Sequence, residues 1–499
     1  MVGTKPLTRL TEPQTSDSVL WSLLSWVRAV GTGGGRVSIE ARGLRVLDLA
    51  LWVMPALLLW PFLDFCLHAA TRASNGFVAY YTAARLLSEG ADVSRFYDDA
   101  WFVARVAERA PAIYDLFSPN PPTTALLLLP FAGLDYTGAR LVWTALNLVG
   151  LLVGLFWLLR ALNLPRLYGR LLVTVLLLYQ PLYSSLFQGQ VYLLVLGLMA
   201  VAWYGYRRGA NLPLGLSLGL MMALKMAAAP LLLLLLVQRR WLALLWATVT
   251  MAGVSIASLP WLGLESWRTY LPLLTSLSTP PEIAATAYQS LSGFVHHIGT
   301  NIALWSGAPI PQSATLASLL TVFGCALLVA LSARRAWGRS DSDAAFSLFV
   351  ATSLIVSPLS VDYHYPLALL PIALLLPLVV GRASRWPLIL LGVATILLAA
   401  DLPYQSPRLA VGAWALLAYP KLYGVALLWG LAFWASGDSR QHNSGDPLMD
   451  WPKGGTVTRV QSAGDTGTSI RRDRERRARV KTAPANLETK RAATAPTGP

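Results

Sequence analysis

The feature that most restricts the fold of this chain is the recurrence of apolar segments about as long as a lipid bilayer is thick. Ten of them occupy residues 46–67, 136–160, 167–187, 190–206, 241–262, 314–333, 343–358, 363–380, 386–400 and 421–436. About 20 apolar residues in a helix cross the hydrocarbon core, and lipid offers the backbone of an open chain no other way to pair its polar groups. The sequence therefore predicts an all-α, polytopic membrane protein with about 10–12 transmembrane helices.

Composition supports this class and excludes others. Of the 499 residues, 55% are hydrophobic and only 13% are charged, which is too apolar for a soluble protein of this length. The formal net charge of +15 does not indicate nucleic acid, because the basic residues lie in short loops and in the C-terminal tail. Cys66 and Cys325 fall in or beside apolar segments and predict no disulfide framework. No ligand spacing indicates a metal site.

Basic loops set the expected orientation. They are residues 160–166, 206–211, 238–241, 332–339 and 381–385. Because basic loops stay in the cytoplasm, we expect a multi-pass plasma-membrane protein with both termini cytoplasmic. Its parts are an N-terminal segment (1–45), a transmembrane domain (46–436) and a disordered basic tail (437–499).

Residues 212–237 conflict with this orientation if they cross the membrane once, because both of their ends are basic. Two half-helices folded as a hairpin, with a break between Lys225 and Pro230, resolve the conflict. The alternative is a single kinked helix whose lysine reaches an interface. In the hairpin Lys225 lies at some depth in the membrane, where a charge is costly and indicates a function.

Five polar segments are then expected together on the outer side. They are residues 68–135, 187–192, 263–313, 357–366 and 401–408. Loops held by a rigid scaffold commonly carry active sites, so we expect one here. In the first segment, residues 78–90 and 91–109 predict amphipathic helices at the membrane interface, and residues 125–131 are too short to cross and are expected to dip in and return.

Several motifs follow one another in an order that resembles glycosyltransferase family 87. They are "FVAYYTAARLLSEG" from Phe77, "PPTTALLLLP" from Pro121, "QGQ" from Gln188, "GLSLGLMMALK" ending at Lys225, "SLSGF" from Ser290 and "SPLSVDYH" ending at His364. The resemblance covers roughly residues 45–436. It implies a cofactor-free membrane enzyme of the GT-C fold that moves a hexose, typically mannose, from a polyprenyl-phosphate donor to an envelope glycolipid or glycan.

One position departs from the family pattern. The family usually has an aspartate directly before the "FxxYY" element as general base, where this chain has Asn75 and Gly76. Neither accepts a proton at neutral pH, so either the chain is an inactive relative or another carboxylate serves. Asp64, at the outer end of the first helix, is the expected substitute. Asp98, Asp99 and Asp362 follow it as candidates.

Transfer to a hydroxyl also requires groups that hold the departing phosphate and the sugar. We expect charge from Lys225, Arg85 and His364, hydrogen bonds from Gln188 and Gln190, and ring stacking from Tyr80, Tyr81 and Trp101. For Asp64 and Asp362 a capping or interfacial role is an equal alternative.

The expected partners are the lipid-linked donor, the acceptor and membrane lipids, with no nucleic acid. His296 and His297 are expected at an interface. The rival functions are an inactive relative and a transporter of lipid-linked sugars. Transporters commonly contain internal repeats, and the two halves of this sequence show no convincing one.

Overall fold

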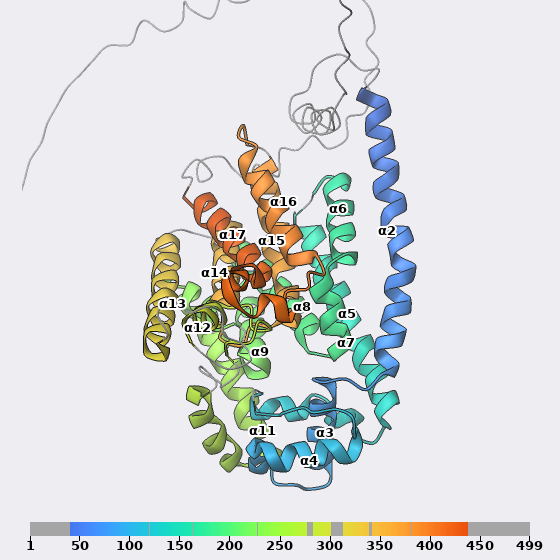
Figure 1. Cartoon of the computed structure of the whole chain (residues 1–499), viewed down its shortest axis with the longest axis vertical. Coiled ribbons are helices and arrows are strands. Elements are labelled where there is room, and N and C mark those ends of the chain that lie inside the picture. The colour runs from blue at the N-terminus through green and yellow to red at the C-terminus, as the bar shows by residue number, and fades with distance from the viewer. Residues whose placement is uncertain are drawn as a thin grey trace, which may run out of the picture. The chain divides into compact units, whose positions relative to one another are not determined.

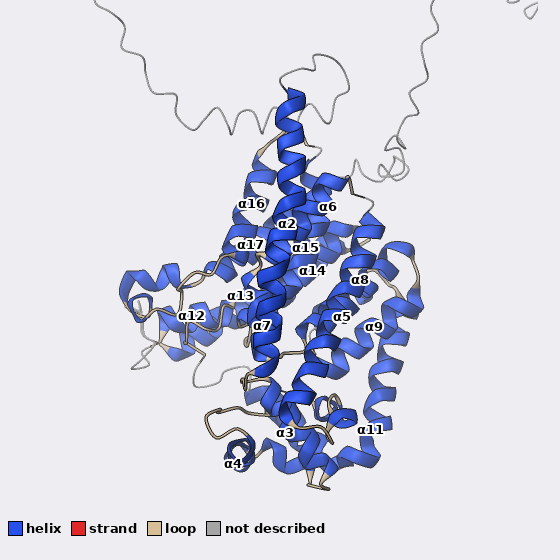
Figure 2. Ribbon diagram, turned by 90° about the vertical axis from the view of Figure 1, so that its right-hand side faces the viewer, coloured by secondary structure: helices blue, strands red, loops and turns tan. Residues whose placement is uncertain are grey.

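The computed structural model describes residues 40–437, except residues 119, 163, 227, 277–282, 301–312, 339–341 and 381. These residues belong to one compact unit. The predictions for residues 1–39 and for the tail from residue 438 lie outside the described residues. Within the described part, all regular structure is helical (Figures 1 and 2).

The α-helices are α2 (Glu40–Thr71), α3 (Phe77–Ser88), α4 (Asp99–Arg109), α5 (Tyr136–Leu162), α6 (Arg166–Leu177), α7 (Gln180–Gln188), α8 (Tyr192–Arg208), α9 (Asn211–Lys225), α10 (Ala229–Val237), α11 (Trp241–Ser276), α12 (Leu291–Gly299), α13 (Ala314–Ala336), α14 (Asp343–Val356), α15 (Leu369–Val380), α16 (Trp386–Ala399) and α17 (Pro420–Ala435). The short 3₁₀ helices are η1 (Val93–Tyr97), η2 (Pro122–Leu126), η3 (Leu129–Phe131), η4 (Asp362–Ala368), η5 (Pro407–Leu409) and η6 (Gly412–Ala418).

Length and hydropathy identify five helical segments in the described residues that can cross a membrane. They are Leu49–Thr71, Tyr136–Leu162, Trp241–Leu274, Ala314–Ala336 and Asp362–Val380. Two bent pairs, α6 with α7 and η6 with α17, raise the number to seven. The all-α polytopic class is confirmed, and all ten predicted segments fall on helices. Fewer than ten qualify as spans because some are short: α14 and α16 have 14 residues each, about 21 Å of helix.

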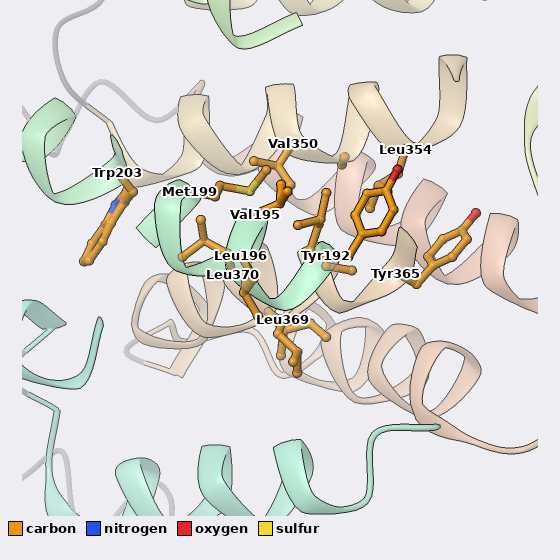
Figure 3. Close-up of a cluster of buried hydrophobic side chains, with 14 of the residues drawn as sticks. Tyr192, Val195, Leu196, Met199, Trp203, Val350, Leu354, Tyr365, Leu369 and Leu370 are labelled. Carbon is orange, nitrogen blue, oxygen red and sulfur yellow. The ribbon is translucent and has the colours of Figure 1, made fainter. Parts of the chain in front are cut away.

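The helical core forms around α8. Figure 3 shows side chains of α8 packed with side chains of η4, α14 and α15; among those labelled are Tyr192, Val195, Met199, Trp203, Val350, Leu354, Tyr365 and Leu369. On another side α8 meets α5, where a Cβ added to Gly154 would lie 3.0 Å from the Cα of Gly197. Small residues at such crossings allow helix backbones to approach closely in membranes.

A second hydrophobic core joins the first polar segment to the later part of α11. Phe96, Phe102 and Phe117 pack there with Val78 of α3 and Tyr270 of α11. Figure 1 shows α3 and α4 beside α11 at one end of the helices. α3 has the predicted extent, but nine of its 12 residues are buried in protein. The prediction of an interfacial helix at this position is therefore wrong, because η2, η3, α4 and α5 pack against this helix.

Residues 212–237 form the predicted hairpin. α9 and α10 are separated by a break that includes Met226, whose φ of 49° is left-handed. After α10 the chain returns to the end of α8: Gln238 Nε2 donates to Tyr206 Oη over 2.9 Å, and the Arg240 guanidinium lies 4.6 Å from the Tyr206 ring centroid. Both ends of the segment therefore lie together, and Lys225 lies at its turn. The single kinked helix is excluded.

Candidate functional site

Lys225 lines a cavity of about 380 Å³ between the turn of the hairpin and residues 353–367. Its described lining includes His364, Ser353, Ser357 and Ser360 beside apolar side chains, and it includes no aspartate or glutamate. The cavity thus combines one cation, several hydroxyls and an apolar wall.

Aromatic and amide side chains surround the Lys225 ammonium. Tyr80 Oη donates to Gln190 Oε1 over 2.6 Å, and Lys225 Nζ lies 5.5 Å from the Tyr80 ring centroid and 5.7 Å from that of Tyr192. The rings of Tyr192 and His364 are 4.3 Å apart between centroids. Four residues singled out in the sequence, Tyr80, Gln190, Lys225 and His364, therefore lie in one cluster.

The segment from Asp115 to Thr124 holds Lys225 in place. Asn120 Oδ1 accepts a hydrogen bond from Lys225 Nζ over 2.6 Å. Thr124 Oγ1 donates to the Leu224 carbonyl over 3.0 Å, and Thr123 Oγ1 donates to the Ala223 carbonyl. The last carbonyls of a helix have no partner within the helix, so these threonines satisfy the end of α9 and fix the lysine that follows.

Asp115 is the carboxylate that the sequence analysis missed. Its side chain is partly buried and accepts hydrogen bonds from the backbone N–H of Gly76 and, over 2.9 Å, from that of Leu116. Burial raises the pKa of Asp115 to about 6, while these backbone hydrogen bonds and the charge of Lys225 act in the opposite direction. A carboxylate with a pKa near neutrality is suited to accept a proton from a hydroxyl.

Gly76 stands where the family usually has its aspartate, and no side chain fits there. Its φ is +85°, and an added Cβ would lie 2.8 Å from the Gln188 carbonyl oxygen and closer still to the Gln190 amide. The Asp115 carboxylate instead reaches the Gly76 N–H from a position 39 residues later. The departure from the family pattern thus coincides with a carboxylate supplied by another segment.

Two residues of α5 shape the turn between Gln188 and Gln190. Arg140 Nη2 donates to the carbonyls of Leu186 and Phe187 over 2.8 and 2.7 Å, and Trp143 Nε1 donates to the Gly189 carbonyl over 2.7 Å. Gly189 has a φ of +62°, and a Cβ there would overlap the Arg140 guanidinium. The glycine is therefore required. No pattern in the sequence indicates that a buried arginine holds this turn.

A second cavity, of about 590 Å³, adjoins the first and shares Tyr288 and Tyr363 with it. Its polar lining comes from four of the predicted outer segments and from α7; besides Tyr288 and Tyr363 it includes Gln180, Ser184, Gln188, Asp362, Asp401, Tyr404, Gln405 and Ser406. Asp362 is 8% exposed and lies 3.8 Å from Lys421 Nζ. Through Tyr80, Gln190, Tyr288, Asp362 and Asp401, all five predicted segments reach one cluster.

The other predicted site residues line neither cavity. Tyr81 Oη donates to the Leu134 carbonyl over 2.9 Å and Arg85 Nη1 to the Ala132 carbonyl over 2.7 Å, so both support the same turn. Asp64 is exposed within α2, 3.4 Å from His68 Nδ1, and Asp99 is exposed in the first turn of α4.

Three further side chains also lie away from the cavities. Trp101 stacks between Arg95 and Arg105, whose guanidinium carbons are 4.6 and 5.8 Å from its ring centroid. His296 and His297 are buried in protein rather than interfacial. His296 is hydrogen-bonded to the Ser292 carbonyl, and His297 to the Ala410 carbonyl. The described residues contain no group of His, Cys, Asp or Glu that could hold a metal ion.

A polytopic membrane protein with a buried cation, a carboxylate of raised pKa and two adjoining cavities has the groups needed to transfer a group from a phosphate ester to a hydroxyl. The model of glycosyltransferase family 87 matches residues 117–358. This match covers just under half of the chain and confirms the resemblance over that region.

Curated relatives come from Mycobacterium tuberculosis. An alpha-(1->3)-arabinofuranosyltransferase is 30% identical over 155 residues, which is 30% of this chain and 36% of that protein. The matched region thus spans about a third of that relative's length. A polyprenol-phosphate-mannose-dependent alpha-(1-2)-phosphatidylinositol mannoside mannosyltransferase is 25% identical over 332 residues, which is 62% of this chain and 73% of that protein. No solved structure matches this chain.

Proposed function

We propose that this chain is a membrane glycosyltransferase of the GT-C fold, which moves a hexose, mannose, from a polyprenyl-phosphate donor to a hydroxyl of an envelope glycolipid or glycan. The reaction inverts the anomeric centre and takes place at the outer face of the plasma membrane. The name of the mannosyltransferase relative supports this donor. The proposal depends on one observation: the Asp115 carboxylate accepts a hydrogen bond from the Gly76 N–H and lies close enough to Lys225 to feel its charge.

The Lys225 cavity is suited to the donor. A lipid phosphate is an anion on an apolar chain, and the cavity offers Lys225 and serine hydroxyls for the anion and Leu354, Val356 and Pro230 for the chain. Lysine binds phosphate as a point charge, and in a low-dielectric site this attraction strengthens as the leaving phosphate gains charge.

Asp115 acts as the general base in this proposal. It accepts the proton of the acceptor hydroxyl, whose oxygen bonds to the anomeric carbon of the donor. The bond from that carbon to the phosphate oxygen breaks, and its electron pair leaves with the polyprenyl phosphate, which Lys225 stabilises. The described side chains thus supply both a base and a cation for this step.

Asp64 is the rival base, and the inactive relative is the rival function. Asp64 is exposed, with a side chain 57% accessible, and its neighbour is His68 on the same helix face. Asp115 instead approaches Gly76, Tyr80 and Lys225. The geometry therefore favours Asp115 and an active enzyme.

Membranes containing the full chain test the donor. Supplied with polyprenyl-phosphate mannose, they should transfer mannose to lipid or glycan acceptors, and with GDP-mannose alone they should not. Membranes with the Asp115→Asn chain serve as the control for endogenous activity. Transfer from polyprenyl-phosphate arabinofuranose, but not from the mannose donor, would replace the hexose with a pentose. Transfer from neither, in membranes where Asp115→Asn and the native chain behave alike, would favour the inactive relative.

A further inference from the structure

The two adjoining cavities differ in charge. Among their described lining residues, the first has Lys225 and His364 and no carboxylate, whereas the second has Asp362 and Asp401 and no lysine, arginine or histidine. The first cavity attracts an anionic group, whereas the second has no lining cation for one, and the nearby Lys421 already pairs with Asp362 over 3.8 Å. The second cavity therefore suits a ligand without a phosphate or carboxylate.

The wall of the second cavity is rich in hydrogen-bond acceptors. Asp362 Oδ1 and Gln180 Oε1 are buried in its wall without a hydrogen-bond donor. The neighbouring Lys421 Nζ donates instead to the carbonyls of Leu398 and Ala400 over 2.7 and 2.9 Å. Buried acceptors without donors are costly, and a ligand carrying hydroxyl groups supplies such donors.

The position of this cavity relative to Asp115 matches that of an acceptor. Gly76 contacts the Asp115 carboxylate through its N–H, and its α-carbon faces the carbonyl of Gln188, which lines the second cavity. Tyr363 belongs to the walls of both cavities. Asp115 itself lines neither cavity, but the second cavity lies next to the Gly76 contact through Gln188 and next to the Lys225 cavity through Tyr363.

We propose that the second cavity binds the acceptor, and that the acceptor's terminal unit is a neutral sugar. This inference rests on the proposed function, because it assigns the other substrate of the same reaction. The neutral sugar can belong to a glycolipid or to a free glycan, since the cavity residues address only the terminal unit. Acceptors that end in a phosphorylated or acidic sugar are disfavoured, because the described lining has no cation to pair with the added charge.

Saturation-transfer NMR on the full chain in lipid nanodiscs tests this without requiring turnover. The probes are methyl α-mannoside, which is neutral, and mannose 6-phosphate. We expect saturation transfer to methyl α-mannoside, at least tenfold weaker binding in Gln180→Ala and Asp401→Asn, and an unchanged signal in Lys225→Gln. Asp135→Asn, which removes an exposed carboxylate from a turn that lines neither cavity, is the matched control.

The outcomes separate the two proposals. Binding of methyl α-mannoside that survives Gln180→Ala and Asp401→Asn but is lost in Lys225→Gln would overturn the cavity assignment. Mannose 6-phosphate binding that these two variants weaken equally would overturn the neutral-sugar requirement. If methyl α-mannoside binds as expected while no lipid-linked sugar is transferred, the cavity assignment holds and the proposed function fails.

Discussion

Asp64 precedes the buried helix α3 in the sequence and Asp115 follows it, and the two carboxylates differ in exposure. Asp64 is exposed on α2 beside His68, whereas Asp115 accepts backbone hydrogen bonds and approaches Lys225. Burial raises the pKa of Asp115 to about 6. In the proposed function the base is therefore not the carboxylate nearest in sequence before the "FxxYY" element, but one from the segment that folds back against Gly76.

The largest expected effect comes from removing one of these two carboxylates. Asp115→Asn should lower kcat by roughly a hundred- to ten-thousandfold, the usual contribution of a general base, with donor KM nearly unchanged. Asp64→Asn should stay within about twofold of the native chain, because an exposed carboxylate at its position has no substrate beside it. Steady-state transfer assays on purified protein measure both. The reverse order of effects would make Asp64 the base.

Placing the family aspartate back at position 76 should abolish activity rather than increase it. In Gly76→Asp the new side chain meets Gln188 and Gln190 and disturbs the contact with Asp115. We expect a loss of at least about a hundredfold in kcat, comparable with loss of the base itself. Gly90→Asp is the matched control, since Gly90 also has a positive φ, +80°, but has open space around it. Activity gained by Gly76→Asp would instead support the inactive relative.

Substitutions at Lys225 and at Arg85 test which of these two predicted cations binds the donor phosphate. Lys225→Gln should raise the donor KM by about ten- to hundredfold, because a charged hydrogen bond to the donor phosphate is lost. Arg85→Gln should leave the donor KM unchanged, since Arg85 bonds to the Ala132 carbonyl and pairs with Glu89. Titration of polyprenyl-phosphate mannose at fixed acceptor measures both. Equal increases would mean that Arg85 also reaches the donor.

The smallest expected effect is on thermal stability. The melting temperature of Asp115→Asn checks the raised pKa of Asp115 independently of activity. Its folded-state pKa is raised from 3.8 to about 6, so the fold favours the protonated form. The corresponding stability is fully present below pH 3.8 and is lost as the pH rises through about 6. At pH 7.5, Asp115→Asn should therefore unfold at the same temperature as the native chain or a few degrees higher. A marked drop in Tm at pH 7.5 would show that the ionised carboxylate stabilises the fold.

Hydropathy and charge were sufficient to predict much of the fold. Each apolar segment became a helix, and the basic ends of residues 212–237 predicted the hairpin that places Lys225 at a turn. These features depend on composition over many residues. Burial of α3 was not predictable in this way, because its cover comes from η1, α4 and α11, which no local pattern connects to it.

The candidate site was predictable only in part, for a similar reason. Tyr80, Gln190, Lys225 and His364 belong to motifs, and the structure brings them together. Asp115 is in no such motif, and it lies 39 residues after Gly76, beyond α3, η1 and α4. Arg140 resembles an ordinary first-turn residue of α5 in the sequence, although it is buried against the carbonyls that precede Gly189.

The pH dependence of kcat/KM tests the central claim most directly. If Asp115 is the base, log kcat/KM for the native chain should rise with a slope of about 1 up to about pH 6, the pKa of its carboxyl, and then level off. Asp64→Asn should give the same curve, and the residual activity of Asp115→Asn should be flat across this range. An acidic limb that persists in Asp115→Asn and disappears in Asp64→Asn would contradict the account.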